Sequence, residues 1–273
     1  MLTQKRLFSG ISLALAATLC LGASSCNATL QEADLMNGVV FMSAEGKALD
    51  DKFISPAADF SVKLFQQSID KGANSMVSPL SVMLALSMTA NGAKNNTLAE
   101  MEKTLGGENS ISELNKYLLS LSESLESDDN KAKFSIANSI WFRDEDLTVN
   151  EDFLETNAKY YDSAIYKLKF DDKAKDTINS WVYNNTDGMI DKIIDEIPAN
   201  AAMYLINAIA FDSDWEKIYE EDSVQDGYFT DLNGDTKTVS MMNSEEYRYI
   251  DDGKATGFIK PYAGGNFSFV ALL

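Results

Sequence analysis

Carboxylates are the strongest acid–base groups that this sequence offers. The 273-residue chain has 42 Asp and Glu residues, no histidine, and two cysteines, Cys20 and Cys26. Without histidine, Ser-His-Asp and Cys-His catalysis and histidine-ligated zinc are excluded for this chain. Both cysteines lie near the N-terminus, so the rest of the chain has no disulfide and no thiol nucleophile. Enzyme chemistry would therefore depend on carboxylates, Lys, Tyr, Ser and Thr.

Several acidic residues occur in pairs where we expect helices and strands to end, for example Asp212 and Asp214. Two carboxylates could hydrolyse a glycosidic bond. In a chain this acidic, however, such pairs arise by chance, and solvated turns explain them better. A surface hydrolase that uses Asp212 and Asp214 is therefore kept only as a minor alternative.

The segment that begins at Asp231 is similar to the start of a calcium loop. Thr236 occupies the position that needs glycine, and Met242 replaces the bidentate glutamate, so a hairpin turn explains the segment better. Glycine pairs elsewhere lack the pattern of a phosphate-binding loop. We therefore expect no cofactor and no metal.

The overall charge excludes one class of partner. The formal net charge is −19 and the pI is about 4.3. Binding to nucleic acid through its phosphates needs clustered lysine and arginine. We therefore expect no nucleic acid as a partner.

The N-terminal residues are typical of a bacterial export signal. Lys5 and Arg6 precede an apolar run from residue 7 to 21, and the four residues ending at Cys26 resemble a lipoprotein cleavage site. We predict a signal peptide at residues 1–25, lipidation of Cys26, and an extracellular or cell-surface location. Plain secretion remains an alternative. Residues 26–50 are predicted to be a tether, and residues 51–273 the folded domain.

Hydrophobic periodicity predicts helices early in the chain and strands late, which indicates an α+β fold. The expected helices cover residues 55–71, 79–90, 97–105, 111–125, 150–161 and 171–186. The expected strands cover residues 75–77, 134–142, 164–170, 203–211, a hairpin over 227–242 with a tight turn at Asn233-Gly234, and 247–250, 255–261 and 267–273.

The helix predicted over residues 79–90 is apolar on nearly every side, so we expect it to be buried all round. Ser78 stands at its N-cap position, with Pro79 in the first turn. Asn91-Gly92 predicts a left-handed stop, and Thr97 with Glu100 predicts a capping box for the next helix.

Two polar features interrupt the most apolar elements. Ser78 and Ser81 lie at the start of the apolar helix, and Asn207 lies in the middle of the apolar strand 203–211. One interpretation is helix capping plus a single satisfied core amide. The other is that these groups meet across a helix–sheet contact and form a polar network there.

Four blocks, in this order and spacing, resemble the serpin family. They are Val77-Ser-Pro-Leu-Ser81, Ile136-Ala-Asn-Ser-Ile-Trp-Phe142, Ile178-Asn-Ser-Trp-Val182, and Leu205-Ile-Asn-Ala-Ile-Ala-Phe211 followed by Trp215. The resemblance extends from about residue 55 to the end of the chain. Asp212-Ser-Asp214 and Ser240 depart from the family pattern.

The resemblance implies a partial serpin fold, in which helices pack on a large mixed sheet A beside incomplete sheets B and C. Ser78, Ser81 and Asn207 would form the shutter, the polar contact beneath the strands that open. Trp215 would lie at the breach, where insertion begins. The buried-strand pattern over residues 267–273 has no turn after it, so we also expect C-terminal truncation, with the reactive-centre loop outside the chain.

The resemblance also implies function. The complete protein is expected to be a monomeric inhibitor of serine or cysteine proteases rather than an enzyme, and to trap its target by inserting the cleaved loop into sheet A. It would contact membranes only through its lipid anchor. The alternative is a surface-anchored binding protein that keeps the serpin scaffold but does not inhibit proteases.

Overall fold

A layer of helices forms the first half of the structure, a computed structural model that describes residues 34–35, 44–70, 72–128, 131–144 and 148–273. The predicted signal peptide and Cys26 lie outside these residues. Among the described residues, no helix combines the length and apolar character needed to cross a membrane. The layer contains α2 (Asp51–Ser68), α3 (Pro79–Ala90), α4 (Asn95–Gly106) and α5 (Ile111–Leu125).

The helices pack on a mixed sheet, which matches the predicted sheet A. Its strands are β1 (Ser127–Asp128), β2 (Ala132–Arg143), β3 (Ala164–Leu168) and β4 (Met203–Ser213). β3 runs parallel to β2, whereas β1 and β4 run antiparallel to it. Two further helices belong to this part of the chain, α6 (Glu151–Tyr161) before β3 and α7 (Asp172–Asn185) after it.

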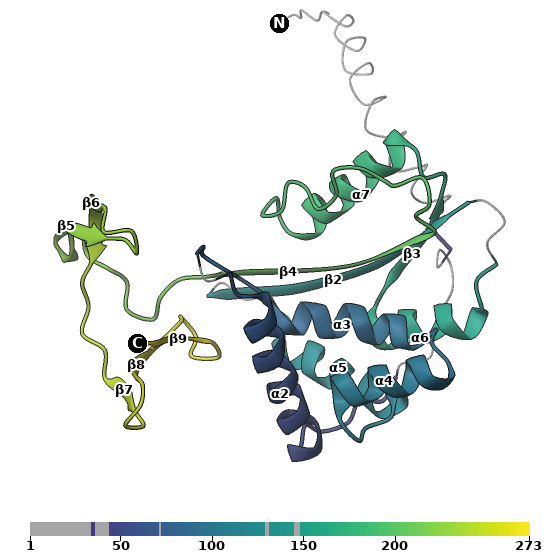
Figure 1. Cartoon of the computed structure of the whole chain (residues 1–273), viewed down its shortest axis with the longest axis horizontal. Helices are drawn as coiled ribbons and strands as arrows, with labels where there is room; N and C mark the ends of the chain where they lie inside the picture. The colour runs from purple at the N-terminus through teal and green to yellow at the C-terminus, as the bar shows by residue number, and fades with distance from the viewer. Residues whose placement is uncertain (1–33, 36–43, 71, 129–130, 145–147) are drawn as a thin grey trace, which may run out of the picture.

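Both faces of the sheet are covered, as Figure 1 shows: α7 lies over one face, and α3 with its neighbouring helices lies over the other. Side chains along a strand alternate between the two faces. Trp141 of β2 and Ile206 of β4 therefore pack with α7, where Ile178 and Val182 are fully buried. Ile136 and Leu205 pack against the helical layer instead.

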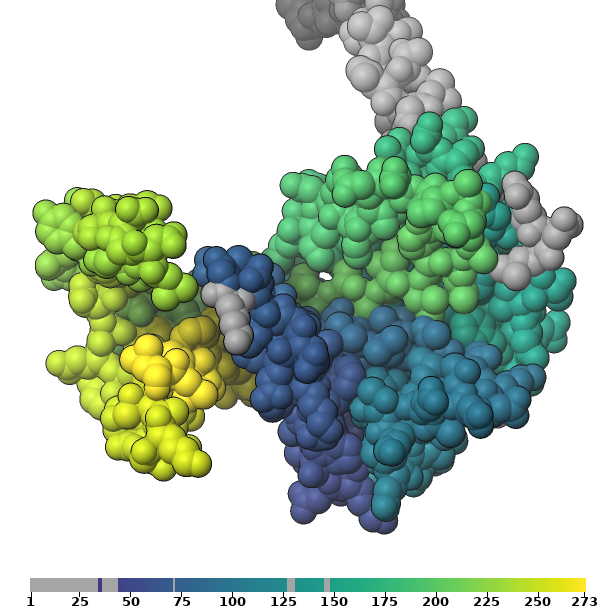
Figure 2. Space-filling model, viewed as in Figure 1, coloured from purple at the N-terminus to yellow at the C-terminus, as the bar shows by residue number. Residues whose placement is uncertain are grey.

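The last part of the chain forms two antiparallel sheets beside sheet A, and in Figure 2 it projects as a separate lobe. A short 3-10 helix, Glu221–Ser223, leads into the first of them. The first sheet pairs β5 (Val224–Thr230) with β6 (Thr236–Met242), and the second contains β7 (Arg248–Asp251), β8 (Thr256–Pro261) and β9 (Ser268–Leu272). The predicted order of helices first and strands last is confirmed.

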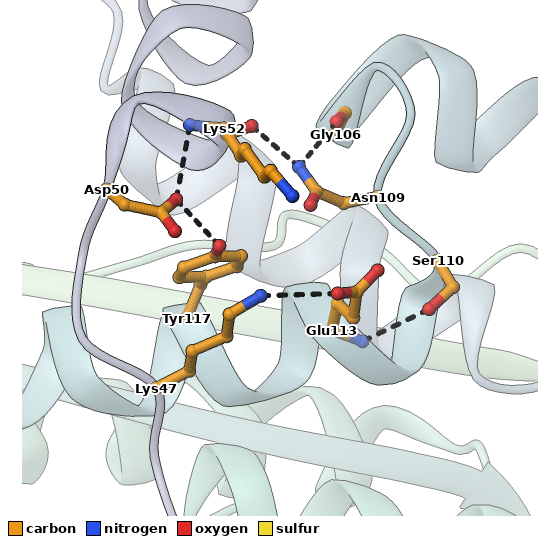
Figure 3. Close-up of polar contacts among 8 residues, drawn as sticks. All are labelled: Lys47, Asp50, Lys52, Gly106, Asn109, Ser110, Glu113 and Tyr117. Atoms are coloured by element: carbon orange, nitrogen blue, oxygen red, sulfur yellow. Dashed lines mark hydrogen bonds and ion pairs between the residues drawn. The ribbon is translucent and has the colours of Figure 1, made fainter.

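α2 begins four residues before its predicted start, because Asp50 caps it by accepting a hydrogen bond from the backbone N–H of Lys52 at 3.1 Å. Pro56 lies inside this helix and has no N–H to donate to the carbonyl of Lys52. The side-chain amide of Asn109 donates to that carbonyl instead, at 2.7 Å, and also to the carbonyl of Gly106 at 2.8 Å (Figure 3). This buried asparagine lets the helix continue through a proline.

Part of the segment predicted to be a tether contacts the helical layer. Asp50 accepts a hydrogen bond from the hydroxyl of Tyr117 at 2.7 Å, and Lys47 forms an ion pair with Glu113 at 3.2 Å (Figure 3). The Tyr117 bond lowers the pKa of the Asp50 carboxyl, and the Lys47 bond lowers that of Glu113. Residues 47–50 therefore lie against α5.

Three local predictions in the helical half were wrong. Residues 75–77 form no strand, and Met76 is almost fully exposed. Asn91 has a right-handed φ of −61° rather than the predicted left-handed conformation, and its side chain turns inward to other asparagines. α4 begins at Asn95, before Thr97, so the predicted capping box does not form.

α3 is also less enclosed than expected, since Leu86 is 37% exposed.

The predicted tight turn of the β5–β6 hairpin is wider than two residues. Asp231 accepts hydrogen bonds at its carboxylate from the backbone N–H groups of Asn233 and Asp235, at 2.9 and 3.1 Å. Only Gly234 of this loop adopts a positive φ, +87°. The carboxylate of Asp231 therefore organises the turn, which agrees with the interpretation of this segment as a hairpin rather than a calcium loop.

The contact between α3 and the rest of the core predicts a position-dependent effect of truncation. Leu84 is 1% exposed, whereas Leu86 on the same helix is 37% exposed. We expect Leu84→Ala to lower the free energy of unfolding by about 2–5 kcal/mol, because it leaves a cavity. Leu86→Ala should change it by less than about 1 kcal/mol. Urea denaturation measures both, and equal losses would contradict the described burial of α3.

Candidate functional site

Three polar side chains meet where α3 crosses β4 and β2. The hydroxyl of Ser81 donates a hydrogen bond to the side-chain oxygen of Asn207. The amide of Asn207 donates to the side-chain oxygen of Asn138 on β2, at 2.8 Å. Asn138 and Asn207 are direct cross-strand partners, so both side chains project to the face that α3 covers. The second interpretation, in which the polar groups meet across the helix–sheet contact, therefore holds for Ser81 and Asn207.

Ser78 has a different position. Its hydroxyl accepts a hydrogen bond from the backbone N–H of Ser81 at 3.3 Å and caps α3, and the residue is exposed. The structure gives it no contact with Asn207. Ser78 thus acts through the helix that it caps, whereas Ser81 reaches the sheet directly.

The hydrogen bonds of this contact lie in a partly to fully buried environment. Asn138 is 6% exposed, and Ser81 and Asn207 are half-buried. A buried amide that loses its partner bears its full desolvation cost. Within the described residues, β4 pairs only with β2, so its outer edge faces away from the sheet with no strand beside it. The contact of Ser81, Asn207 and Asn138 therefore holds β4, the strand at the edge of the sheet, in place on α3.

Trp215 lies just beyond β4 and joins sheet A to the sheet of β7–β9. Its ring stacks on Tyr262 with the centroids 4.5 Å apart, and it lies nearly perpendicular to the ring of Phe269 with the centroids 6.0 Å apart. The backbone N–H of Glu216 donates to the carbonyl of Pro261, and that of Ala263 donates to the carbonyl of Asp214. The half-buried Trp215 is therefore an aromatic link between the two sheets.

A buried lysine lies beneath this aromatic link. The side chain of Lys260 is 5% exposed, and its ammonium lies 2.5 Å from a carboxylate oxygen of Glu246. The rings of Tyr219 and Trp215 lie 4.6 and 5.3 Å from the same ammonium, within cation–π range. Burial acts to lower the pKa of Lys260, but Glu246 and Tyr219 outweigh it and raise that pKa. The bond from Lys260 lowers the pKa of Glu246.

The acidic residues that occur in pairs in the sequence are exposed, cap a helix or form an ion pair in the structure. Asp212 and Asp214 are exposed, and the carboxylate of Asp171 caps α7 through the N–H of Ala174. Asp144 forms an ion pair with Lys167 at 3.2 Å. In the part of the chain that the structure describes, no three metal-ligating side chains gather.

Sequence reasoning missed three residues of this region. Asn138 could have been found as Asn207 was, as the single amide in the middle of an apolar strand. Lys260 also interrupts an apolar run, residues 258–262, whereas Glu246 lies among charged and polar neighbours and carried no comparable signal. Only the fold brings the two together.

The Lys260–Glu246 pair predicts a pH-dependent loss of stability. Glu246→Gln should lower the free energy of unfolding at pH 7 by about 1–3 kcal/mol, the usual value of a hydrogen bond to a charged group. Because the folded-state pKa of Glu246 is lowered, its contribution is complete above the ordinary value of 4.5. It is lost as the pH falls through the folded-state pKa. Urea denaturation between pH 7 and 3 should therefore show wild type and variant converging.

The exposed neighbour Glu245 provides the matched control, and Glu245→Gln should leave stability nearly unchanged at every pH. A difference between wild type and Glu246→Gln that stays constant down to pH 3 would contradict the ionic character of the pair.

Comparison with known proteins places these features in one family. The family model for serpins (serine protease inhibitor) matches residues 55–273. Human Serpin I2 is 29% identical over 226 residues, which are 79% of this chain and 56% of Serpin I2. A serpin-like protein of Methanosarcina acetivorans is 28% identical over 225 residues, which are 78% of this chain and 51% of that protein.

Comparison with solved structures also identifies the serpin fold. The native state of the thermophilic serpin tengpin superimposes with a TM-score of 0.84 at 50% identity, over 88% of this chain and 62% of tengpin. The chain thus spans between half and two thirds of the length of these relatives. The match over most of its length and the shared fold show that this chain belongs to the serpin family.

Proposed function

We propose that the protein to which this chain belongs is a protease inhibitor of the suicide-substrate type, acting on serine or cysteine proteases. A protease would attack an exposed reactive loop and form an acyl-enzyme, and the cleaved loop would then enter sheet A as a new strand. Insertion of the reactive loop in serpins is a known form of β-strand addition. In this proposal the chain supplies the accepting sheet and is not itself an enzyme.

The observation that supports the proposal best is the contact of Ser81, Asn207 and Asn138 at the border of sheet A. An inserting strand needs a neighbour to which its backbone can bond, and we infer that β4 supplies it on the side opposite β2. It also needs a sheet that can shift on the helices beneath it. We infer that Ser81, Asn207 and Asn138 form the shutter that controls this shift, with Ser78 capping its helix.

The second support is the position of Trp215. It joins the end of β4 to the sheet of β7–β9 through Tyr262 and Phe269. We infer that this link is the breach, where a strand would begin to enter. Lys260 and Glu246 would then stabilise the closed breach from below.

The reactive loop is proposed to lie in the part of the relatives that this chain does not span. The 273-residue chain should therefore form no SDS-stable complex with any protease in a panel of serine and cysteine proteases. A longer protein that also carries the region equivalent to the rest of tengpin should form such complexes. A protease whose nucleophile is blocked serves as the control, because it cannot form the acyl-enzyme.

The outcomes of this assay separate the alternatives. A complex formed by residues 1–273 alone would contradict the proposed location of the loop. Cleavage of the longer protein without any stable complex would favour the alternative, a binding protein on a serpin scaffold. The hydrolase is tested in a separate assay: glycoside turnover that is lost in Asp212→Asn or Asp214→Asn would support it.

We further propose that the protein is exported and anchored through a lipid on Cys26, and that it acts as a monomer. Expression in a bacterium with labelled palmitate should label the mature protein and place it in the membrane fraction. Cys26→Ser should remove the label and release the protein, whereas Cys20→Ser should leave both unchanged. A soluble, unlabelled wild-type protein would instead support plain secretion.

A further inference from the structure

A second polar cluster lies inside the helical layer, between the end of α3, α5 and α6. The amide of Asn115 donates to the side-chain oxygen of Asn91 at 2.9 Å, and the amide of Asn91 donates to that of Asn157 at 3.0 Å. The hydroxyl of Tyr161 donates to the side-chain oxygen of Asn115 at 2.5 Å. Asn115, Asn157 and Tyr161 are each at most 4% exposed. Three helices are thus joined by side-chain amides in a mostly apolar layer.

Tyr161 connects this cluster to sheet A. It is the last residue of α6, and Asp162 after it adopts a left-handed φ of +48°. The final carbonyl groups of a helix have no partner within the helix. The carbonyl of Tyr161 accepts a hydrogen bond from the amide of Asn138, at 2.7 Å. The same residue thus holds Asn115 with its hydroxyl and Asn138 with its backbone.

The result is one chain of contacts from α3, along the helix-covered face of the sheet, to α6 and α5, with Tyr161 linking two sets of hydrogen bonds through its own covalent structure. It starts at Ser81, passes through Asn207 and Asn138 to Tyr161, and continues to Asn115. In such a path each amide is oriented by its neighbours, and removal of one partner leaves the next buried group unsatisfied. Burial raises the pKa of the Tyr161 hydroxyl, so the hydroxyl stays a donor at physiological pH.

We propose that Asn115 and Tyr161 are positioning residues for sheet A: they hold Asn138, and through it Asn207, and so determine how readily β2 and β4 shift on the helices. The inference rests on the proposed function, in which that shift accompanies strand insertion. Neither residue would touch the protease or the inserted loop.

Hydrogen exchange on the 273-residue chain tests the proposal. Tyr161→Phe keeps the ring and removes only the hydroxyl that binds Asn115. We expect amides paired between β2 and β4, around Asn138 and Asn207, to exchange about tenfold faster or more. Amides of α2 should change much less. A uniform acceleration, or none in β2 and β4, would overturn the proposal.

Asn109 supplies the control for a purely structural effect. It is also a buried asparagine of the helical layer, 6% exposed, but its amide binds only the carbonyls of Lys52 and Gly106. Asn109→Ala should weaken α2 and leave the protection of β2 relative to that of α2 unchanged or higher. If Asn109→Ala loosened the β2–β4 pair as strongly as Tyr161→Phe, the effect would be one of general stability.

A double-mutant cycle gives a second, independent test. The change in the unfolding equilibrium constant caused by Asn115→Leu should depend at least threefold on whether Asn207→Ala is present, although the two side chains do not touch. The effects of Asn109→Ala and Asn207→Ala should simply multiply. If Asn115→Leu does not fold, Tyr161→Phe replaces it. Multiplicative effects for the linked pair would overturn the proposal. Neither measurement uses a protease, so failure of the proposed inhibition would be seen separately.

Discussion

The hydrogen-bonded pair of Asn138 and Asn207 constrains how sheet A lies on its helices. The two residues face each other across β2 and β4 in a contact that is otherwise mostly apolar. A slip of two positions would keep the apolar pattern but place Asn207 opposite Ile136 or Ile140. The hydrogen bond between the two amides would then be lost, at a cost of about 1–3 kcal/mol. The polar pair therefore specifies the strand register more sharply than the apolar residues can.

The two faces of the sheet are held by different kinds of contact. On the face beneath α7, the indole N–H of Trp141 donates to the hydroxyl of Ser139 in the same strand, at 2.8 Å. That contact also includes aromatic and aliphatic packing, for example of Trp141 with Trp181, and an ion pair of Lys133 with Asp187, which follows α7. On the opposite face, Asn138 and Asn207 bond to groups of α6 and α3. The asparagine bonds thus tie β2 and β4 to α6 and α3 on this face of the sheet.

Much of the fold follows from local sequence patterns, and the exceptions have physical causes. The bounds of α3 and α5 agree with the prediction because serine caps and regular apolar spacing mark both helices. The start of α2 was missed because Asp50, which caps the helix, was assigned to the tether. The helix continues through Pro56 because Asn109, more than fifty residues away in sequence, binds the carbonyl of Lys52.

The same limit applies to the site. Ser81 and Asn207 were identified because each interrupts an apolar element. Asn138 interrupts one in the same way, but only the pairing of β2 with β4 shows that it binds Asn207. Asn91 ends α3 as expected, but with a right-handed backbone, and its side chain joins three helices. Sequence patterns indicate which polar residues are unusual; the pairing of distant elements decides what they bind.

A second cross-strand contact holds β2 and β4 together, four positions from the asparagine pair. Phe134 and Phe211 are cross-strand partners. Both rings pack on Phe267, in the segment before β9, with ring centroids 5.5 and 5.1 Å apart. The sheet of β7–β9 thus fastens the same two strands that the asparagines join. Because β2 and β4 are tied at both places, separation between them is opposed by amide bonds and aromatic packing together. The strand addition that we propose would therefore take place at the outer edge of β4 and not between β2 and β4.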